Sequence, residues 1–172
     1  YLSSYDFNKY KKEKKTAITT LYIAAKDFLT SQLVELQTLV EVVSLTKSLV
    51  NEPLNYLDAL KFSELATEAG KKYGFETEIL HKEKIQELKM GGLLSVNLGS
   101  ETPPTFNIFH YKPANAINEK PLVLVGKGVM FDTGGYSLKV GGSMPGMKSD
   151  MAGGAAIVGL LSAIAGNKLP YH

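Results

Sequence analysis

Residues 31–50 carry the clearest periodic pattern of the chain. Their apolar positions recur at spacings of three, four and seven residues, as on one face of an amphipathic helix. These positions are Leu33, Leu36, Val40, Val43 and Val50. We predict that this helix ends at residues 51–53, because the ring of Pro53 opposes its continuation.

A second helix is predicted over residues 56–72, and a half-buried strand follows it. The apolar face of this helix consists of Leu57, Leu60, Phe62, Leu65 and Ala69. Gly70 or Gly74 marks its end, since glycine readily adopts the left-handed conformation that closes many helices. Residues 75–80 then alternate apolar and polar side chains, which predicts a strand with one buried face.

Shorter segments complete the expected elements. Residues 16–25 are rich in Thr, Ile, Leu and Tyr, which favour a strand. Residues 82–89 are consistent with a short helix, and residues 93–96 and 106–111 with strands. Residues 121–125 form a continuous apolar run, which is typical of a strand covered on both faces.

The alternation of helices and strands predicts the α/β class, with a mostly parallel or mixed sheet flanked by helices. Residues 1–172 are expected to form a single α/β domain, with residues 1–15 as a basic lead-in segment. In such sheets, ligands bind beyond the carboxyl ends of the strands. The segment after Val125 is therefore the expected place for a site.

Composition narrows the possible functions only a little. The net charge of +2 requires neither nucleic acid nor an acidic partner, and the absence of Cys excludes disulfides and thiolate chemistry. No uninterrupted apolar run is long enough for a membrane span. Five lysines lie within residues 9–15. They fit either a nucleic-acid or phosphate-binding tail or a solvated surface segment, and we favour the second interpretation.

Residues 126–154 form a loop unusually rich in glycine, with nine Gly among 29 residues. Glycine allows the backbone to approach a ligand closely. The loop does not match the patterns of phosphate-binding loops. Met147 separates Gly146 from Lys148 where a Walker motif has adjacent residues, and Phe131 replaces the last glycine of a dinucleotide-binding motif.

Four ionisable residues of this loop are the candidate chemistry: Lys127, Asp132, Lys139 and Asp150. Because Lys and Asp are rarely buried without partners, they need either each other or a ligand. One interpretation is structural, with two ion pairs and Asp150 as the N-cap of the following helix. The other is a metal site, and the residues alone leave both open.

The amino-acid sequence of the loop resembles that of the cytosolic leucine aminopeptidase family. The similar stretch reads KGVMFDTGG from Lys127, SLK ending at Lys139, and DMAGGA from Asp150. The four charged residues are separated by intervals of five, seven and eleven, as in that family. Residues 51–55 and 93–111 extend the resemblance, which covers about residues 30–172. The chain thus resembles the N-terminal part of the family's catalytic domain, and hence a partial domain.

The resemblance implies a role for five residues. Lys127, as a neutral amine, and Asp150 would bind one divalent metal, and Asp132 would bridge it to a second. Lys139 would remain cationic and stabilise the oxyanion that develops at the peptide carbonyl. Met147 would line the pocket for the substrate's N-terminal side chain, although a packing role in the core is an alternative.

The resemblance also implies a reaction and its cofactors. Family members use two metal ions (Zn, with Mn or Mg as alternatives) and a bridging hydroxide to remove the N-terminal residue of a peptide. The expected partners are therefore a peptide substrate with a free N-terminus and, as in the hexameric full-length relatives, further copies of the chain. We expect a cytoplasmic protein with no membrane partner.

One departure from the family changes the expectation for activity. The family's remaining carboxylate ligands and its catalytic arginine lie in an N-T-D-A-E-G-R segment, which this sequence lacks, and the sequence contains no Arg. Smaller departures occur at Thr133, residues 148–149 and Ala152. We therefore expect the 172-residue chain alone to be inactive and to bind metal weakly or not at all. A non-enzymatic relative with a structural or interaction role is the alternative.

Overall fold

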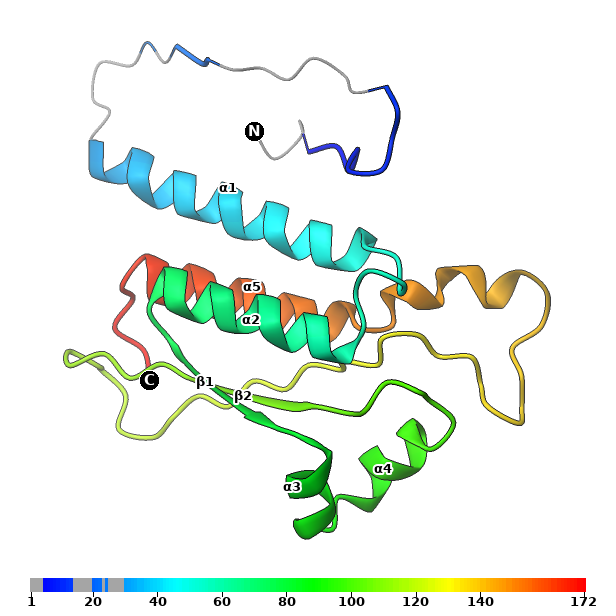
Figure 1. The fold of residues 1–172 in the computed structure, drawn as a ribbon. Helices are drawn as coiled ribbons and strands as arrows, with labels where there is room; N and C mark the ends of the chain where they lie inside the picture. Colours follow the sequence, from blue (N-terminus) through cyan, green and yellow to red (C-terminus); the bar gives the residue numbers. More distant parts are fainter. Residues whose placement is uncertain (1–4, 14–19, 23, 25–29) are drawn as a thin grey trace.

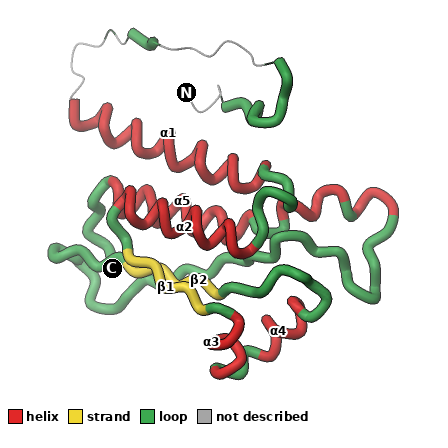
Figure 2. The backbone as a smooth tube through the Cα atoms, viewed as in Figure 1, coloured by secondary structure: helices red, strands yellow, loops and turns green. Residues whose placement is uncertain are grey.

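In the computed structural model, three helices lie along one side of a small antiparallel sheet (Figures 1 and 2). The structure describes residues 5–13, 20–22, 24 and 30–172. Within them, α5 contacts both α1 and α2, and α2 contacts the first strand. This arrangement confirms the α/β class, whereas the two described strands pair antiparallel and not in the mostly parallel or mixed sheet that was predicted.

The elements follow one another in a simple order along the chain. The α-helices are α1 (Thr30–Asn51), α2 (Ala59–Tyr73), α3 (Lys82–Glu87), α4 (Gly91–Asn97) and α5 (Ala152–Gly166). The strands are β1 (Glu76–Leu80) and β2 (Phe106–His110). Two 3-10 helices, η2 (Gly141–Ser143) and η3 (Pro145–Ser149), precede α5.

Helices α1 and α2 confirm the two predictions from apolar periodicity, and α2 shows why its ends are sharp. The Asp58 side chain accepts a hydrogen bond from the Lys61 N–H at 2.8 Å, which caps the first turn. At the other end Gly74 has a φ of 91° in the left-handed region, and its N–H donates to the Gly70 carbonyl.

The two strands confirm the predictions for residues 75–80 and 106–111. They pair in an antiparallel ladder, with Glu76 opposite His110 and Leu80 opposite Phe106. The strand predicted at residues 93–96 is wrong, because this segment lies within helix α4. A short apolar run of this kind fits a helix or a strand, and the sequence pattern alone does not distinguish them.

The apolar run 121–125 also departs from the prediction, since it forms no strand in the described structure. Leu122 is 66% exposed and Val125 is 89% exposed, so the run is not covered on both faces. The Leu122 N–H donates to the His172 carbonyl at 2.7 Å, but the run pairs with neither strand of the described two-stranded sheet. Most of the strand predicted at residues 16–25 lies outside the described residues.

The core is built where α5 meets α1 and α2. Its buried apolar residues include Leu49, Phe62, Ala66, Met151, Ala155 and Val158. Gly159 lets α5 approach α1 closely, because a Cβ at this position would overlap the Thr46 hydroxyl. The core therefore fixes α5, and with it the end of the glycine-rich loop.

Residues Gly141–Gly166 are long and apolar enough to pass a length and composition test for a membrane span. Their helical part, α5, lies instead at the centre of the domain, where Ala155 and Val158 are fully buried. The apolar character of this segment is thus explained by its place in the core.

Candidate functional site

Residues 126–154 leave the sheet layer, pass through η2 and η3, and return to the N-terminus of α5 (Figure 1). The two ends of this loop touch, since the Gly154 N–H donates to the Lys127 carbonyl at 2.7 Å. A Cβ on Gly126 would overlap the Gly153 carbonyl. Glycine is therefore required for the backbone contact that places Lys127 beside the start of α5.

Lys127 and Asp150 form the first charged pair of the site. Lys127 Nζ lies 2.9 Å from Asp150 Oδ2, and the side chain of Asp150 is 19% exposed. Oδ2 itself is buried and accepts no hydrogen bond from the described residues, so the contact is an ion pair without hydrogen-bond geometry. Asp150 thus holds a buried anionic oxygen with unused acceptor capacity.

Asp132 and Lys139 form the second charged pair, with Lys139 Nζ 3.4 Å from Asp132 Oδ2. Asp132 Oδ1 accepts a hydrogen bond of 2.9 Å from the Gly134 N–H. That bond lowers the pKa of the Asp132 carboxyl below its ordinary value, and the charges of Lys139 and Lys127 lower it further. A backbone bond from Lys139 N–H to the Thr133 carbonyl, at 2.9 Å, closes the turn.

The structural interpretation of the four charged residues is confirmed in one respect and wrong in another. Both ion pairs are present. The N-cap position of α5 is occupied by Met151, however, and no side chain caps that helix. Asp150 lies one residue too early for this role, and its carboxylate faces Lys127 instead.

Met147 lies in η3, and the Asp150 N–H donates to the Met147 carbonyl at 3.2 Å. Its side chain is half-buried. This places the predicted pocket residue one turn before a predicted metal ligand. His81 and His110 lie outside this loop, with His81 before α3 and His110 opposite Glu76 in the sheet.

The donor set fits a divalent cation only in part. Carboxylate oxygens suit hard cations, and the unused Oδ2 of Asp150 is the kind of buried acceptor that a cation satisfies. Among the described residues, no group of three His, Cys, Asp or Glu side chains could hold a metal ion. The available ligands are thus two carboxylates, Asp132 and Asp150, and the Lys127 amine.

Comparison with known proteins identifies the family of the chain. The catalytic domain of the cytosol aminopeptidase family matches residues 44–172. The chain belongs to this family. The match includes α2, the whole of residues 126–154 and α5. It confirms the resemblance to leucine aminopeptidases.

Relatives in the cytosol aminopeptidase family are much longer than this chain. A protein named "Probable cytosol aminopeptidase" from Chloroherpeton thalassium is 51% identical over 129 residues, which are 75% of this chain and 25% of that protein. A protein of the same name from Clostridium perfringens is 39% identical over an alignment of 180 positions, which covers 99% of this chain and 36% of that protein. The chain thus spans about a quarter to a third of these relatives.

Solved structures of the family have the same fold over this region. The bottromycin maturation enzyme BotP in complex with Mn matches with a TM-score of 0.86 and 30% identity, over 99% of this chain and 35% of its own. Leucine aminopeptidase from Caenorhabditis elegans matches with a TM-score of 0.74 and 30% identity, over 80% of this chain and 28% of its own. One of these structural neighbours was therefore determined in complex with Mn.

Sequence reasoning missed one residue of this region, Lys148. Its ammonium group donates a 2.9 Å hydrogen bond to the carbonyl of Asn51, at the C-terminal end of α1. The two residues are 97 positions apart, so no local spacing indicates the contact. In the sequence, the one sign of a role for Lys148 was its position between Met147 and Asp150.

Proposed function

We propose that this chain supplies half of the two-metal site of an aminopeptidase. The observation that carries the proposal is the Lys127–Asp150 ion pair, whose Oδ2 is buried, within a loop that matches the family's catalytic domain. The proposed substrate is a peptide with a free N-terminus. The proposed cofactors are two divalent ions, zinc or manganese or magnesium.

Each charged residue has a separate part in this proposal. Asp132 and Asp150 would supply anionic oxygens to the ions, and Lys127 would supply its side-chain nitrogen. When bound, the two ions would supply Lewis-acid polarisation of the peptide carbonyl and an activated water. Lys139 keeps its charge and stabilises the negative charge that develops on the carbonyl oxygen.

The arrangement of the ion pairs supports these parts. In the described structure each carboxylate is balanced by one lysine, so the site is electrically neutral overall. The hydrogen bond from the Gly134 N–H keeps Asp132 ionised and fixes the direction of its carboxylate. The loop is therefore organised around its charges before any cation arrives, which lowers the cost of assembling the site.

A chimera with a longer relative tests the function of these residues. In the Chloroherpeton thalassium protein, the segment that matches this chain is replaced by residues 44–172 of this chain. We expect the chimera to release leucine from an N-terminal leucine anilide, to lose this activity with a chelator, and to regain it with Mn²⁺ or Zn²⁺. An inactive chimera that folds and assembles like the active parent would contradict the proposal.

The isolated chain is expected to behave differently from the chimera. Three ligands do not hold two ions at full affinity, and the run Leu122–Val125 remains exposed. We therefore predict no measurable turnover of the anilide and fewer than two bound metal ions per chain. Elemental analysis and a long-duration assay check this, and two stoichiometric zinc ions or metal-dependent turnover would refute it.

The alternative function is a non-enzymatic relative with a structural or interaction role. The absence of a cluster of three acidic or histidine ligands among the described residues is the observation that favours it. The chimera separates the two functions. A non-enzymatic segment would leave the chimera folded and without metal-dependent activity, whereas a catalytic segment restores that activity.

We also propose a cytoplasmic protein that forms homo-oligomers and has neither membrane nor nucleic-acid partners. The relatives' name, cytosol aminopeptidase, supports the location. Two lysines of the basic cluster already have internal partners, since Lys9 pairs with Glu52 at 3.1 Å and Lys11 with Asp6 at 3.2 Å. These pairs reduce the charge available for a polyanion.

A further inference from the structure

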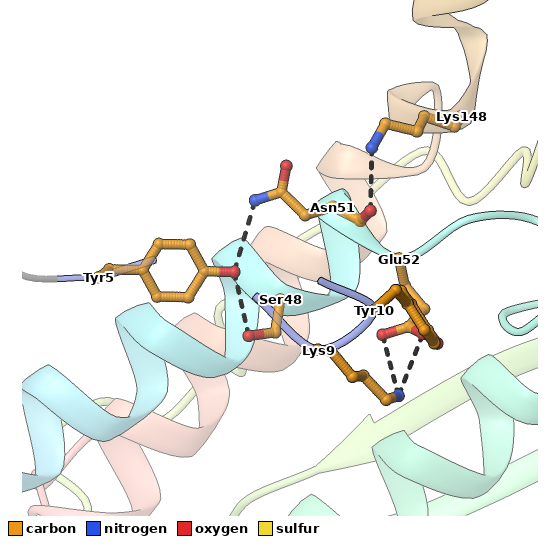
Figure 3. Close-up of polar contacts among 7 residues, drawn as sticks. All are labelled: Tyr5, Lys9, Tyr10, Ser48, Asn51, Glu52 and Lys148. Atoms are coloured by element: carbon orange, nitrogen blue, oxygen red, sulfur yellow. Dashed lines mark hydrogen bonds and ion pairs between the residues drawn. The ribbon is translucent and has the colours of Figure 1, made fainter. Parts of the chain in front are cut away.

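The C-terminal end of α1 is a fixed point to which two distant parts of the chain attach (Figure 3). The Tyr56 and Leu57 N–H groups donate to the Pro53 carbonyl at 2.9 and 3.0 Å, and Leu57 is 2% exposed. The chain after the helix is therefore held by its own turn and by burial in the core.

Glu52 strengthens this fixed point from the N-terminal side. Its carboxylate is largely buried and accepts hydrogen bonds from Lys9 Nζ at 3.1 and 3.2 Å and from the Tyr10 hydroxyl. The Tyr10 ring stacks on Tyr56 with 4.5 Å between ring centroids. Residues before and after α1 thus hold the same short segment in place.

The second attachment comes from the candidate site. Figure 3 shows Lys148 reaching from η3 to the Asn51 carbonyl, one residue before Glu52. The last carbonyls of a helix have no partner within the helix and carry partial negative charge, so a lysine ammonium is a favourable donor there. Among the described contacts, this is the side-chain hydrogen bond that joins η3 to α1.

Element η3 is short and rigid enough to transmit this contact. The Met147 N–H donates to the Met144 carbonyl at 2.9 Å, and the Ser149 hydroxyl to the Gly146 carbonyl at 2.7 Å. Fixing Lys148 therefore fixes its neighbours as well. The two nearby residues with proposed functions are Met147, which precedes Lys148 directly, and Asp150, two residues after Lys148.

We propose that Lys148 is a positioning residue for the aminopeptidase site: by holding η3 against the end of α1, it sets the places of Met147 and Asp150. This inference rests on the proposed function for its catalytic consequence, but its structural part does not. Lys148 touches neither substrate nor metal in this proposal. It acts through the backbone of η3.

The structural part is tested by hydrogen exchange in the 172-residue chain. The variant Lys148→Met keeps the length and apolar stem of the side chain and removes the donor. We expect the amides of residues 146–150 to exchange about tenfold faster in K148M, and at the original rate in K148R and in K112M. Lys112 is an exposed lysine outside the site and serves as the control. Unchanged exchange in K148M would overturn the proposal.

The functional part is tested in the chimera with the same three variants. We expect K148M to lower kcat about tenfold and to weaken Mn²⁺ affinity, since displaced supports of metal ligands typically cost 10- to 100-fold. K148R should restore kcat to within about threefold, because Arg can donate to the same carbonyl. A K148M chimera as active as K112M would overturn the proposal. An inactive parent chimera would instead overturn the proposed function, while the exchange result still decides the structural part.

Discussion

In the chimera, replacing Asp150 by Asn is expected to lower kcat/KM for the leucine anilide about 1000-fold. The amide keeps the size of the carboxylate but carries no negative charge, so it neither ligates a hard cation strongly nor balances Lys127. Loss of one ion's contribution to transition-state stabilisation is worth several kcal/mol, and each 1.36 kcal/mol is a factor of ten in rate.

The control for this variant is Glu119→Gln, which neutralises an exposed carboxylate in a loop outside residues 126–154. It changes the net charge by the same amount and should leave kcat/KM within about twofold of the parent. Steady-state kinetics at saturating Mn²⁺ measure both variants. If D150N retains a tenth or more of the parent activity, Asp150 is not a ligand that the reaction requires.

The largest expected effect on stability follows from Gly159→Ala at the contact of α5 with α1. Gly159 is buried, and a Cβ there would overlap the hydroxyl of Thr46, which donates to the Val42 carbonyl at 2.9 Å. Overpacking of this kind typically costs about 1–3 kcal/mol. We expect G159A to lower the free energy of unfolding by that amount, measured by urea denaturation followed by circular dichroism.

Replacing Gly92 by Ala is expected to raise the free energy of unfolding instead of lowering it. Gly92 lies within helix α4, and a Cβ there would meet no atom within 4 Å. Alanine in place of a helical glycine stabilises by about 0.5–1 kcal/mol.

The double variant Thr46→Ala with Gly159→Ala should recover part of the stability lost in G159A, since the overlapping hydroxyl is gone. Equal effects of G159A and G92A would show that α5 does not approach α1 as closely as described.

The sequence was sufficient for the parts of the fold whose information is local. Apolar spacing predicted α1 and α2, and alternation predicted β1. In α1, however, the buried apolar residues are Val42 and Leu49, whereas the predicted positions Leu33 and Leu36 are exposed. The strand prediction for residues 93–96 failed because a short apolar run fits a helix or a strand equally well. The strand prediction for residues 121–125 failed because a strand needs paired neighbours, and this run pairs with neither β1 nor β2.

The candidate site shows the same division between local and distant information. The intervals between Lys127, Asp132, Lys139 and Asp150 were visible in the sequence, and the structure pairs these four residues. The partner of each lysine was not visible, since it depends on how the loop closes on itself. The contact of Lys148 with Asn51 was still less accessible, because the two segments meet only through the packing of α1 against α5.

Anomalous diffraction from crystals of the chimera soaked in Mn²⁺ shows directly whether the loop holds metal ions. We expect two manganese peaks beside the glycine-rich loop, within ligand distance of Lys127 Nζ, Asp132 and Asp150. Peaks that lack these three residues as ligands, or no manganese at this loop in an active chimera, would contradict the proposed function.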